Sequence, residues 1–233
     1  MRYKNLTIIG TSHISPESIR VVERIIRQKK PAVIALELDK QRLASLLARH
    51  GKRKPTIALI KKVGFKGWLF AIIGAWLERS LGKKVGTVPG SEMLKAVQLA
   101  RELRIPIVLI DQDITITLKR LSEAITWKEK WHLLLDVFGA LLFRHGVDFD
   151  ISGVPSKRLL EKLISHVKAR YPNIFRVIVE ERNEFMAKAL SRILFKFRKK
   201  PIVAVVGAGH EAEVLKLVKR YLKQEFETTL KKR

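Results

Sequence analysis

Short apolar runs separated by amphipathic segments recur along this chain, and this alternation predicts an α/β fold. Each run is four to six residues long, which is the length of a buried strand rather than of a helix. A glycine or a carboxylate follows each of them directly. Strands are predicted at 6–9, 32–36, 105–110 and 201–206, and they are followed by Gly10, Glu37, Asp111 and Gly207.

Helices are predicted between these strands, where apolar residues recur at helical spacing. Ser15 and Pro16 begin the first helix, because serine is a favoured cap and proline suits the first turn. Two strands joined through such a helix are expected to be parallel, with a right-handed crossover. The main helices are predicted at 15–30, 41–50, 93–103, 174–197 and 211–226.

The predicted fold class is therefore α/β, with a mostly parallel central sheet, helices on both faces and an inserted helical cap. We expect a single domain over 1–233, with helical insertions at about 41–87 and 118–170. Within the first insertion, 57–81 carries Trp68, Phe70 and Trp76 at helical spacing. Such a stretch either covers the core or lies as an amphipathic segment on a membrane surface, and both interpretations stay open.

Basic residues strongly outnumber acidic ones. The chain has 47 Lys and Arg against 22 Asp and Glu, a formal net charge of +25, which attracts polyanions. The basic runs lack the interleaved aromatic residues of a single-strand groove, and no nucleic-acid-binding motif is present, so nucleic acid is not favoured as a partner. Solvated charged helix faces, or apposition to an anionic membrane, are the preferred interpretation.

The sequence contains no cysteine, which excludes disulfides, thiolate nucleophiles and zinc sites built on sulfur. No apolar stretch is long enough to cross a bilayer, and the first residues do not form a signal peptide. We therefore expect a protein that is cytoplasmic or peripheral to a membrane. Its chemistry must come from histidines, carboxylates and hydroxyl groups.

Two segments share one design, an apolar strand followed by Gly-x-x-His and a helix. The first motif runs from Gly10 to His13 and the second from Gly207 to His210. Because the carboxyl ends of parallel strands line the ligand crevice of an open α/β sheet, both imidazoles should lie there together with Glu37 and Asp111. Two neutral histidines and one carboxylate are a frequent catalytic metal set. Hydrolysis is the predicted use.

Plainer structural roles compete with this hypothesis. A histidine after a strand can be a hydrogen-bonded turn residue. Glu37 can instead cap the next helix or pair with Arg42, and Asp111 and Asp113 can form turns. The segment 207–212 also fits G-x-G-x-x-A, the dinucleotide fingerprint, but it lacks the second strand with its acidic residue.

Six segments in the same order carry a resemblance to a known family: GTSHIS at 10–15, ALELD at 35–39, VPGSEM at 88–93, LIDQDI with TLKR at 109–120, EERNEFMA at 180–187 and VVGAGH at 205–210. As a set they resemble the TraB/PrgY (pheromone shutdown) family over nearly the whole chain. The wider group includes the Tiki metalloproteases and is similar in its core to the erythromycin esterase and ChaN-like folds.

The resemblance implies a metal-dependent hydrolase scaffold in which His13, His210 and Glu37 matter. We expect the histidines to bind a divalent ion, Mn, Co or Zn, with Glu37 as the third ligand or as the base. Glu181 is expected to hold the fork of Arg182, which would steady a substrate carboxylate or an oxyanion. Arg120 is a further candidate catalytic residue, and the remaining expected pocket residues are Gly10, Ser12, Glu92, Asp111, Asp113 and Gly207.

The predicted function is that of a metal-dependent peptidase or hydrolase acting on short signalling peptides. The alternative is a non-catalytic module that binds or sequesters a peptide pheromone, with or without membrane association. A third hypothesis is a basic protein that binds a membrane surface or a polyanion. The expected partner is a short peptide substrate or ligand, and an anionic membrane surface and a homo-oligomer stay open.

Overall fold

A computed structural model describes residues 1–12, 15–48, 90–143 and 157–230 of the chain. The strands are β1 (Arg2–Tyr3), β2 (Leu6–Thr11), β3 (Val33–Leu36), β4 (Ile107–Leu109) and β5 (Ile202–Gly207). The helices are α1 (Pro16–Lys29), α2 (Lys40–Leu47), α4 (Ser91–Glu102), α5 (Ile114–Ala124), α6 (Trp127–Phe143), α7 (Lys157–Arg170), α8 (Pro172–Phe175), the π-helical η1 (Arg176–Glu180), α9 (Glu181–Lys196) and α10 (Ala208–Leu230).

The sheet has the order β1-β2-β5-β3-β4, and its four longer strands are parallel. The last strand in the chain, β5, lies between β2 and β3, with Gly207 opposite Thr11 and Val205 opposite Leu36. Only the short β1 runs antiparallel. The predicted α/β class with a mostly parallel sheet is confirmed, whereas β1 is too short to leave a pattern in the sequence.

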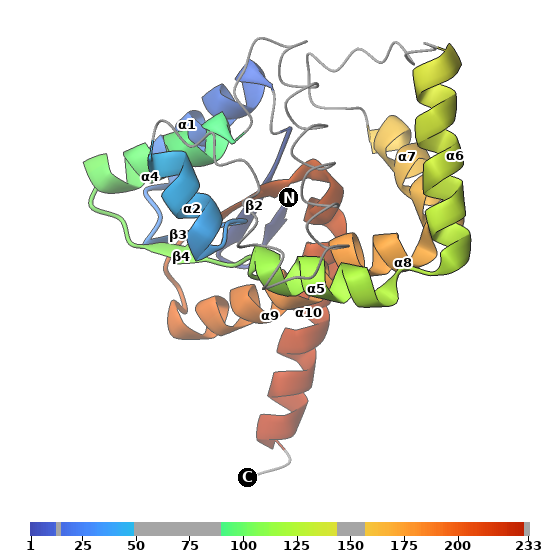
Figure 1. The fold of residues 1–233 in the computed structure, drawn as a ribbon. Coiled ribbons are helices and arrows are strands. Elements are labelled where there is room, and N and C mark those ends of the chain that lie inside the picture. Colours follow the sequence, from blue (N-terminus) through green and yellow to red (C-terminus); the bar gives the residue numbers. More distant parts are fainter. Residues whose placement is uncertain (13–14, 49–89, 144–156, 231–233) are drawn as a thin grey trace.

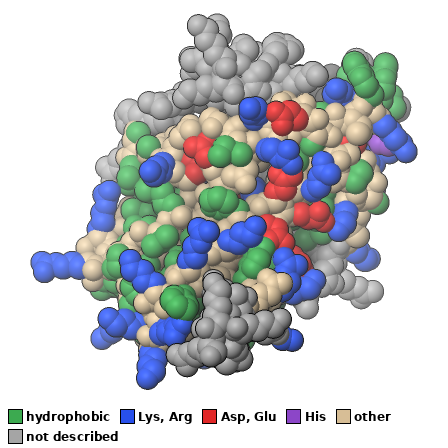
Figure 2. All heavy atoms as spheres, turned by 90° about the horizontal axis from the view of Figure 1, so that it is seen from below, with side chains coloured by type: hydrophobic (Ala, Val, Ile, Leu, Met, Phe, Trp, Pro, Cys, Tyr) green, Lys and Arg blue, Asp and Glu red, His purple; other side chains and the backbone are tan. Residues whose placement is uncertain are grey.

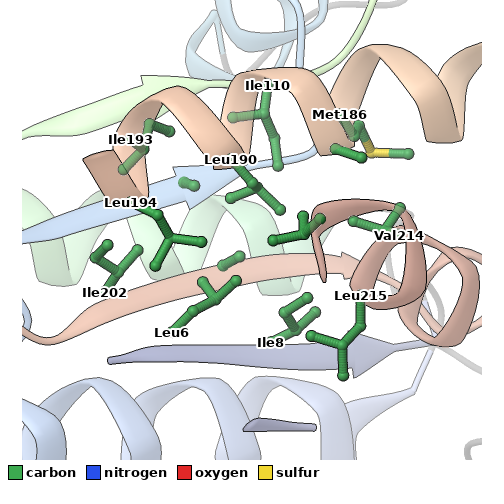
Figure 3. Packing of buried hydrophobic residues seen from close by; sticks show 14 of the residues in the cluster. Leu6, Ile8, Ile110, Met186, Leu190, Ile193, Leu194, Ile202, Val214 and Leu215 are labelled. Carbon is green, nitrogen blue, oxygen red and sulfur yellow. The ribbon is translucent and has the colours of Figure 1, made fainter. Parts of the chain in front are cut away.

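Helices cover both faces of the sheet, as predicted. Successive residues of a strand face opposite sides, so Val203 and Val205 of β5 pack with α1 and α4. The intervening Ala204 and Val206 pack with α9 and α10. Figure 3 shows the apolar cluster between the sheet and helices α9 and α10. Leu190 of α9 lies between the helices and the sheet in this cluster. Every residue of β5 is buried, which explains why the strand contains only apolar residues and glycine.

The predicted helices over 118–170 are present as α5, α6 and α7, with 144–156 outside the described residues. Residues 49–87 of the first insertion, including 57–81, also lie outside them. The helix predicted over 174–197 is present as one continuous helical run made of α8, η1 and α9, with a π-helical turn at η1 within it. Among the described helices, none combines the length and apolarity needed to cross a bilayer.

Helices α6 and α7 are joined by one charged cluster and lie side by side at one end of the molecule (Figure 1). Arg170 donates to Asp136 from Nε at 2.8 Å and from Nη2 at 2.5 Å. The hydroxyl of Tyr171 donates to the same carboxylate. Hydrogen bonds from Arg170 and then Tyr171 lower the pKa of Asp136 from 3.8 to about 2. Burial and then the contact with Asp136 raise the pKa of Tyr171 from 10.0 to about 12.

Replacing Asp136 with asparagine should lower the pKa of Tyr171, which should still stay above 10.0 because burial is the larger cause of its shift. Ultraviolet difference titration measures this, with Tyr171→Phe identifying the signal. The wild-type contact should contribute stability at neutral pH and lose it as the pH falls from 3.8 towards 2, since the folded pKa of Asp136 is the lower one. An unchanged tyrosine titration in Asp136→Asn would contradict the contact.

The basic residues are not gathered into a single patch on the face seen in Figure 2. Lys and Arg side chains are distributed over most of that face, with Asp and Glu side chains among them. Elsewhere in the described residues, several cations are paired across elements, for example Arg27 with Glu102 and Arg220 with Glu184. The positive charge on this face is therefore spread out rather than concentrated.

Candidate functional site

The carboxyl ends of the four parallel strands bring the predicted site residues to one edge of the sheet. β2 ends at Thr11 and β5 at Gly207, and these two residues are register partners. Glu37 follows β3 directly, and Asp111 follows β4 after one further residue. Both Gly-x-x-His motifs thus leave neighbouring strands in the same direction, as the sequence predicts. His13 itself lies outside the described residues.

Glycine is needed at the first motif because two elements approach closely there. A Cβ at Gly10 would stand 3.2 Å from the Cα of Ala208, at the start of α10, and 2.5 Å from a carboxylate oxygen of Glu211. The backbone N–H of Ser12 donates to the hydroxyl of Ser18 at 3.0 Å, which connects the residue after β2 to the first turn of α1. The close approach of Gly10 to Ala208 places the first motif against the second.

Arg182 occupies the centre of the cluster. Its Nε and Nη2 donate to the two carboxylate oxygens of Asp111, both at 2.9 Å. Nη2 also donates to Oε1 of Glu37 at 2.5 Å, and Nη1 donates to the carbonyl of Ile178 at 3.2 Å. With Nη1 lying 3.4 Å from Nε2 of His210, all five donor hydrogens of the guanidinium have an acceptor.

The cluster is almost fully buried. The side chains of Glu37 and Asp111 are 2% and 3% exposed, and that of Arg182 is 13% exposed. Burial works to lower the pKa of Arg182, but the charge of Glu37 and the hydrogen bonds of Asp111 outweigh it and hold that pKa above its ordinary value. Removing any one of these charges would leave the others buried without full compensation.

Glu37 also joins two strands. Its Oε2 accepts a hydrogen bond from the backbone N–H of Gly207 at 2.6 Å, while Oε1 contacts Arg182. The competing structural roles for Glu37 are wrong: Asp39, not Glu37, caps α2, and the partner of Arg42 is Asp111 at 3.2 Å. Glu37 therefore faces the site.

Asn183 determines how His210 presents its ring. Nδ1 of His210 lies 2.6 Å from Oδ1 of Asn183, which can only accept, so the proton is on Nδ1. Arg182 can only donate, so Nε2 of His210 accepts from it. The neutral ring thus turns Nε2 towards Glu37, whose Oε1 is 3.5 Å away. Sequence analysis did not select Asn183, although it stands next to Arg182 in the motif at 180–187.

The other predicted residues lie around this cluster with separate partners. Asp113 caps α5 through the backbone N–H of Thr115 at 2.7 Å, in agreement with the turn-forming alternative. Arg120 forms a two-point pair with Glu181, at 3.2 and 2.8 Å. The expectation that Glu181 holds the fork of Arg182 is therefore wrong. Glu92 is buried in the first turn of α4.

Two of the three predicted donors lie close enough to share one ion. Glu37 Oε1 and His210 Nε2 are 3.5 Å apart, a separation that one ion at roughly 2.0–2.2 Å from each donor can span. Within the described residues no group of three or more histidine and carboxylate side chains could hold a metal ion. His13, the predicted third donor, is not among those residues. The described part of the chain thus offers two donors of the expected type.

In comparisons with known proteins, one family model matches almost the whole chain. The model of the TraB/PrgY/gumN family matches residues 2–229. An uncharacterized protein of Methanocaldococcus jannaschii is 36% identical over 93% of this chain and 54% of its own length. TraB domain-containing proteins of Bos taurus and Homo sapiens are 26% and 25% identical over 87% of the chain and 59% and 60% of their own lengths. The chain therefore spans little more than half the length of these relatives.

Proposed function

Because the chain belongs to the TraB/PrgY/gumN family, we propose that it is a metal-dependent hydrolase, and specifically a peptidase acting on short peptides. The observation that carries the proposal is the pair formed by the buried Glu37 and the partly buried His210 at the edge where β2 and β5 end, with the donor atoms 3.5 Å apart. The motif that ends in His13 leaves the neighbouring strand at the same edge.

Glu37, His210 and His13 are the proposed ligands of a divalent ion, Mn, Co or Zn. When bound, such an ion polarises a carbonyl oxygen and makes a nearby water more acidic. Glu37 contributes a negative charge that the N–H of Gly207 helps to hold in place. Asn183 keeps the proton of His210 on Nδ1, so that Nε2 can act as a ligand.

The two arginines have different roles in this proposal. All five donor hydrogens of Arg182 are engaged within the protein, so without a bound ion this residue holds Glu37 and Asp111 in place and has no donor left for substrate. Arg120 is about half exposed and is held by Glu181. It is the better candidate for binding the carboxylate of a peptide, since a guanidinium at the surface can exchange one carboxylate partner for another.

Replacing His13 and His210 together with alanine should abolish both metal uptake and hydrolysis. Elemental analysis of the purified protein measures the first, and a peptide-cleavage screen with and without Mn²⁺, Co²⁺ or Zn²⁺ measures the second. His166→Ala, which removes an exposed histidine of α7, is the matched control and should keep the wild-type metal content. A double variant that retains bound metal and the normal cleavage rate would exclude these histidines as ligands.

A non-catalytic peptide-binding module is the second candidate. It is favoured because the hydrogen-bonding groups of the cluster are already engaged: both oxygens of Glu37 and every donor of Arg182 have partners within the protein. Such a module should bind peptide equally well with and without a chelator and should show no turnover with any of the three metals. Loss of peptide binding on chelation would instead favour the hydrolase.

A further inference from the structure

We propose that Arg182 acts as a tethered cation that competes with a divalent ion for the donors Glu37 and His210. The proposal rests on the metal site of the proposed function, but it does not depend on hydrolysis. Arg182 contacts the same two atoms that the ion would use: Nη2 lies 2.5 Å from Oε1 of Glu37, and Nη1 lies 3.4 Å from Nε2 of His210.

Arg182 and a divalent ion cannot contact Glu37 and His210 at the same time, because both carry positive charge. A guanidinium and a divalent ion that share the same two donors would stand within a few ångströms of each other in a buried site, where like charges are weakly screened. A guanidinium keeps its proton in proteins, so Arg182 cannot relieve this repulsion by losing its charge. The ion must therefore displace the guanidinium from Glu37 and His210.

Asp111 provides the anchor that keeps the arginine nearby. It accepts hydrogen bonds from Nε and Nη2 of Arg182, and Arg42 supports the same carboxylate at 3.2 Å. In the absence of an ion, Arg182 and Arg42 together balance the negative charges of Glu37 and Asp111 and thereby preserve the fold of the site. The contact of Arg182 with Glu37 lowers the affinity of the site for metal, because binding an ion must first break it.

Arg182→Gln tests the competition, since glutamine keeps hydrogen-bonding capacity without the charge. Isothermal titration with Mn²⁺ should show an affinity that is about tenfold or more above that of the wild type. Arg220→Gln is the matched control, because it also removes one positive charge paired to a carboxylate of α9, and its affinity should match the wild type. Arg182→Lys, which retains the charge, should not gain affinity.

A measurement on the wild-type protein covers the case in which Arg182→Gln does not fold. Phenylglyoxal labels accessible guanidinium groups, and mass spectrometry can follow the peptide that contains Arg182. Its labelling should be slow without metal, because the side chain is 13% exposed, and should become faster when Mn²⁺ is added. Labelling of Arg220 should not change.

Three results would overturn the competition: weaker Mn²⁺ binding in Arg182→Gln, no Mn²⁺ binding in that folded variant, or slower labelling of Arg182 in the presence of Mn²⁺. Failure of the proposed hydrolase looks different. If Arg182→Gln gains Mn²⁺ affinity while the wild-type protein cleaves no peptide with any metal, the competition stands and the hydrolase proposal falls.

Discussion

Replacing Glu37 with alanine should lower the free energy of unfolding by about 3–5 kcal/mol, the usual cost of removing one partner from a buried ion pair. Arg182 would keep only Asp111 as a carboxylate partner, and the backbone N–H of Gly207 would lose its acceptor. Because Glu37 connects β3 to the end of β5, the substitution should weaken the centre of the sheet.

Chemical denaturation followed by circular dichroism measures this effect. Glu37→Gln separates charge from hydrogen bonding, since its amide oxygen can still accept from Gly207, and it should be less destabilising than alanine. Glu102→Gln, which breaks the exposed pair with Arg27, is the control and should change the midpoint little. A midpoint of Glu37→Ala equal to that of Glu102→Gln would show that the cluster contributes nothing to stability.

Replacing Leu190 with alanine should cost about 2–5 kcal/mol, because the change removes a fully buried side chain and leaves a cavity. For a chain of this length the loss corresponds to a fall in melting temperature of about 4–20 °C. Leu190 packs α9 onto the sheet (Figure 3), and the same helix carries Arg182 and Asn183. The variant should therefore also loosen the site.

Calorimetry measures the melting temperature, and Leu135→Ala is the control. Leu135 is 60% exposed on α6, so its truncation should have little effect on stability. If the two leucine variants melt at the same temperature, Leu190 does not have the role in the core that its burial indicates.

The sequence predicts the strands and the chemistry at their ends because both are local signals. Each strand is a run of apolar residues, and Gly10, Glu37 and Asp111 follow at or near its end. The position of β5 between β2 and β3 is not a local signal, since it depends on which edges pair after the helices have packed. The π-helical turn η1 also lacks a signal, because it lies inside a continuous helical pattern.

The contacts of α9 show why the site could be predicted only in part. Glu181 and Arg182 are consecutive on a helix, and consecutive residues do not face each other. Glu181 therefore reaches Arg120 of α5, whereas Arg182 points to the strand ends and Asn183 to His210. The motif identifies the residues, but the packing of α9 against the sheet determines their partners.

The central position of β5 has a consequence for synthesis of the protein on the ribosome. The residues of β2 emerge nearly two hundred positions before their main hydrogen-bonding partner does, since Leu6 pairs with Ile202. Until that late segment emerges, the nascent chain exposes an unpaired apolar strand edge, which is a template for aggregation. Chaperone binding or slow release from the ribosome should therefore matter more for this topology than for one in which neighbouring strands are also consecutive in the chain.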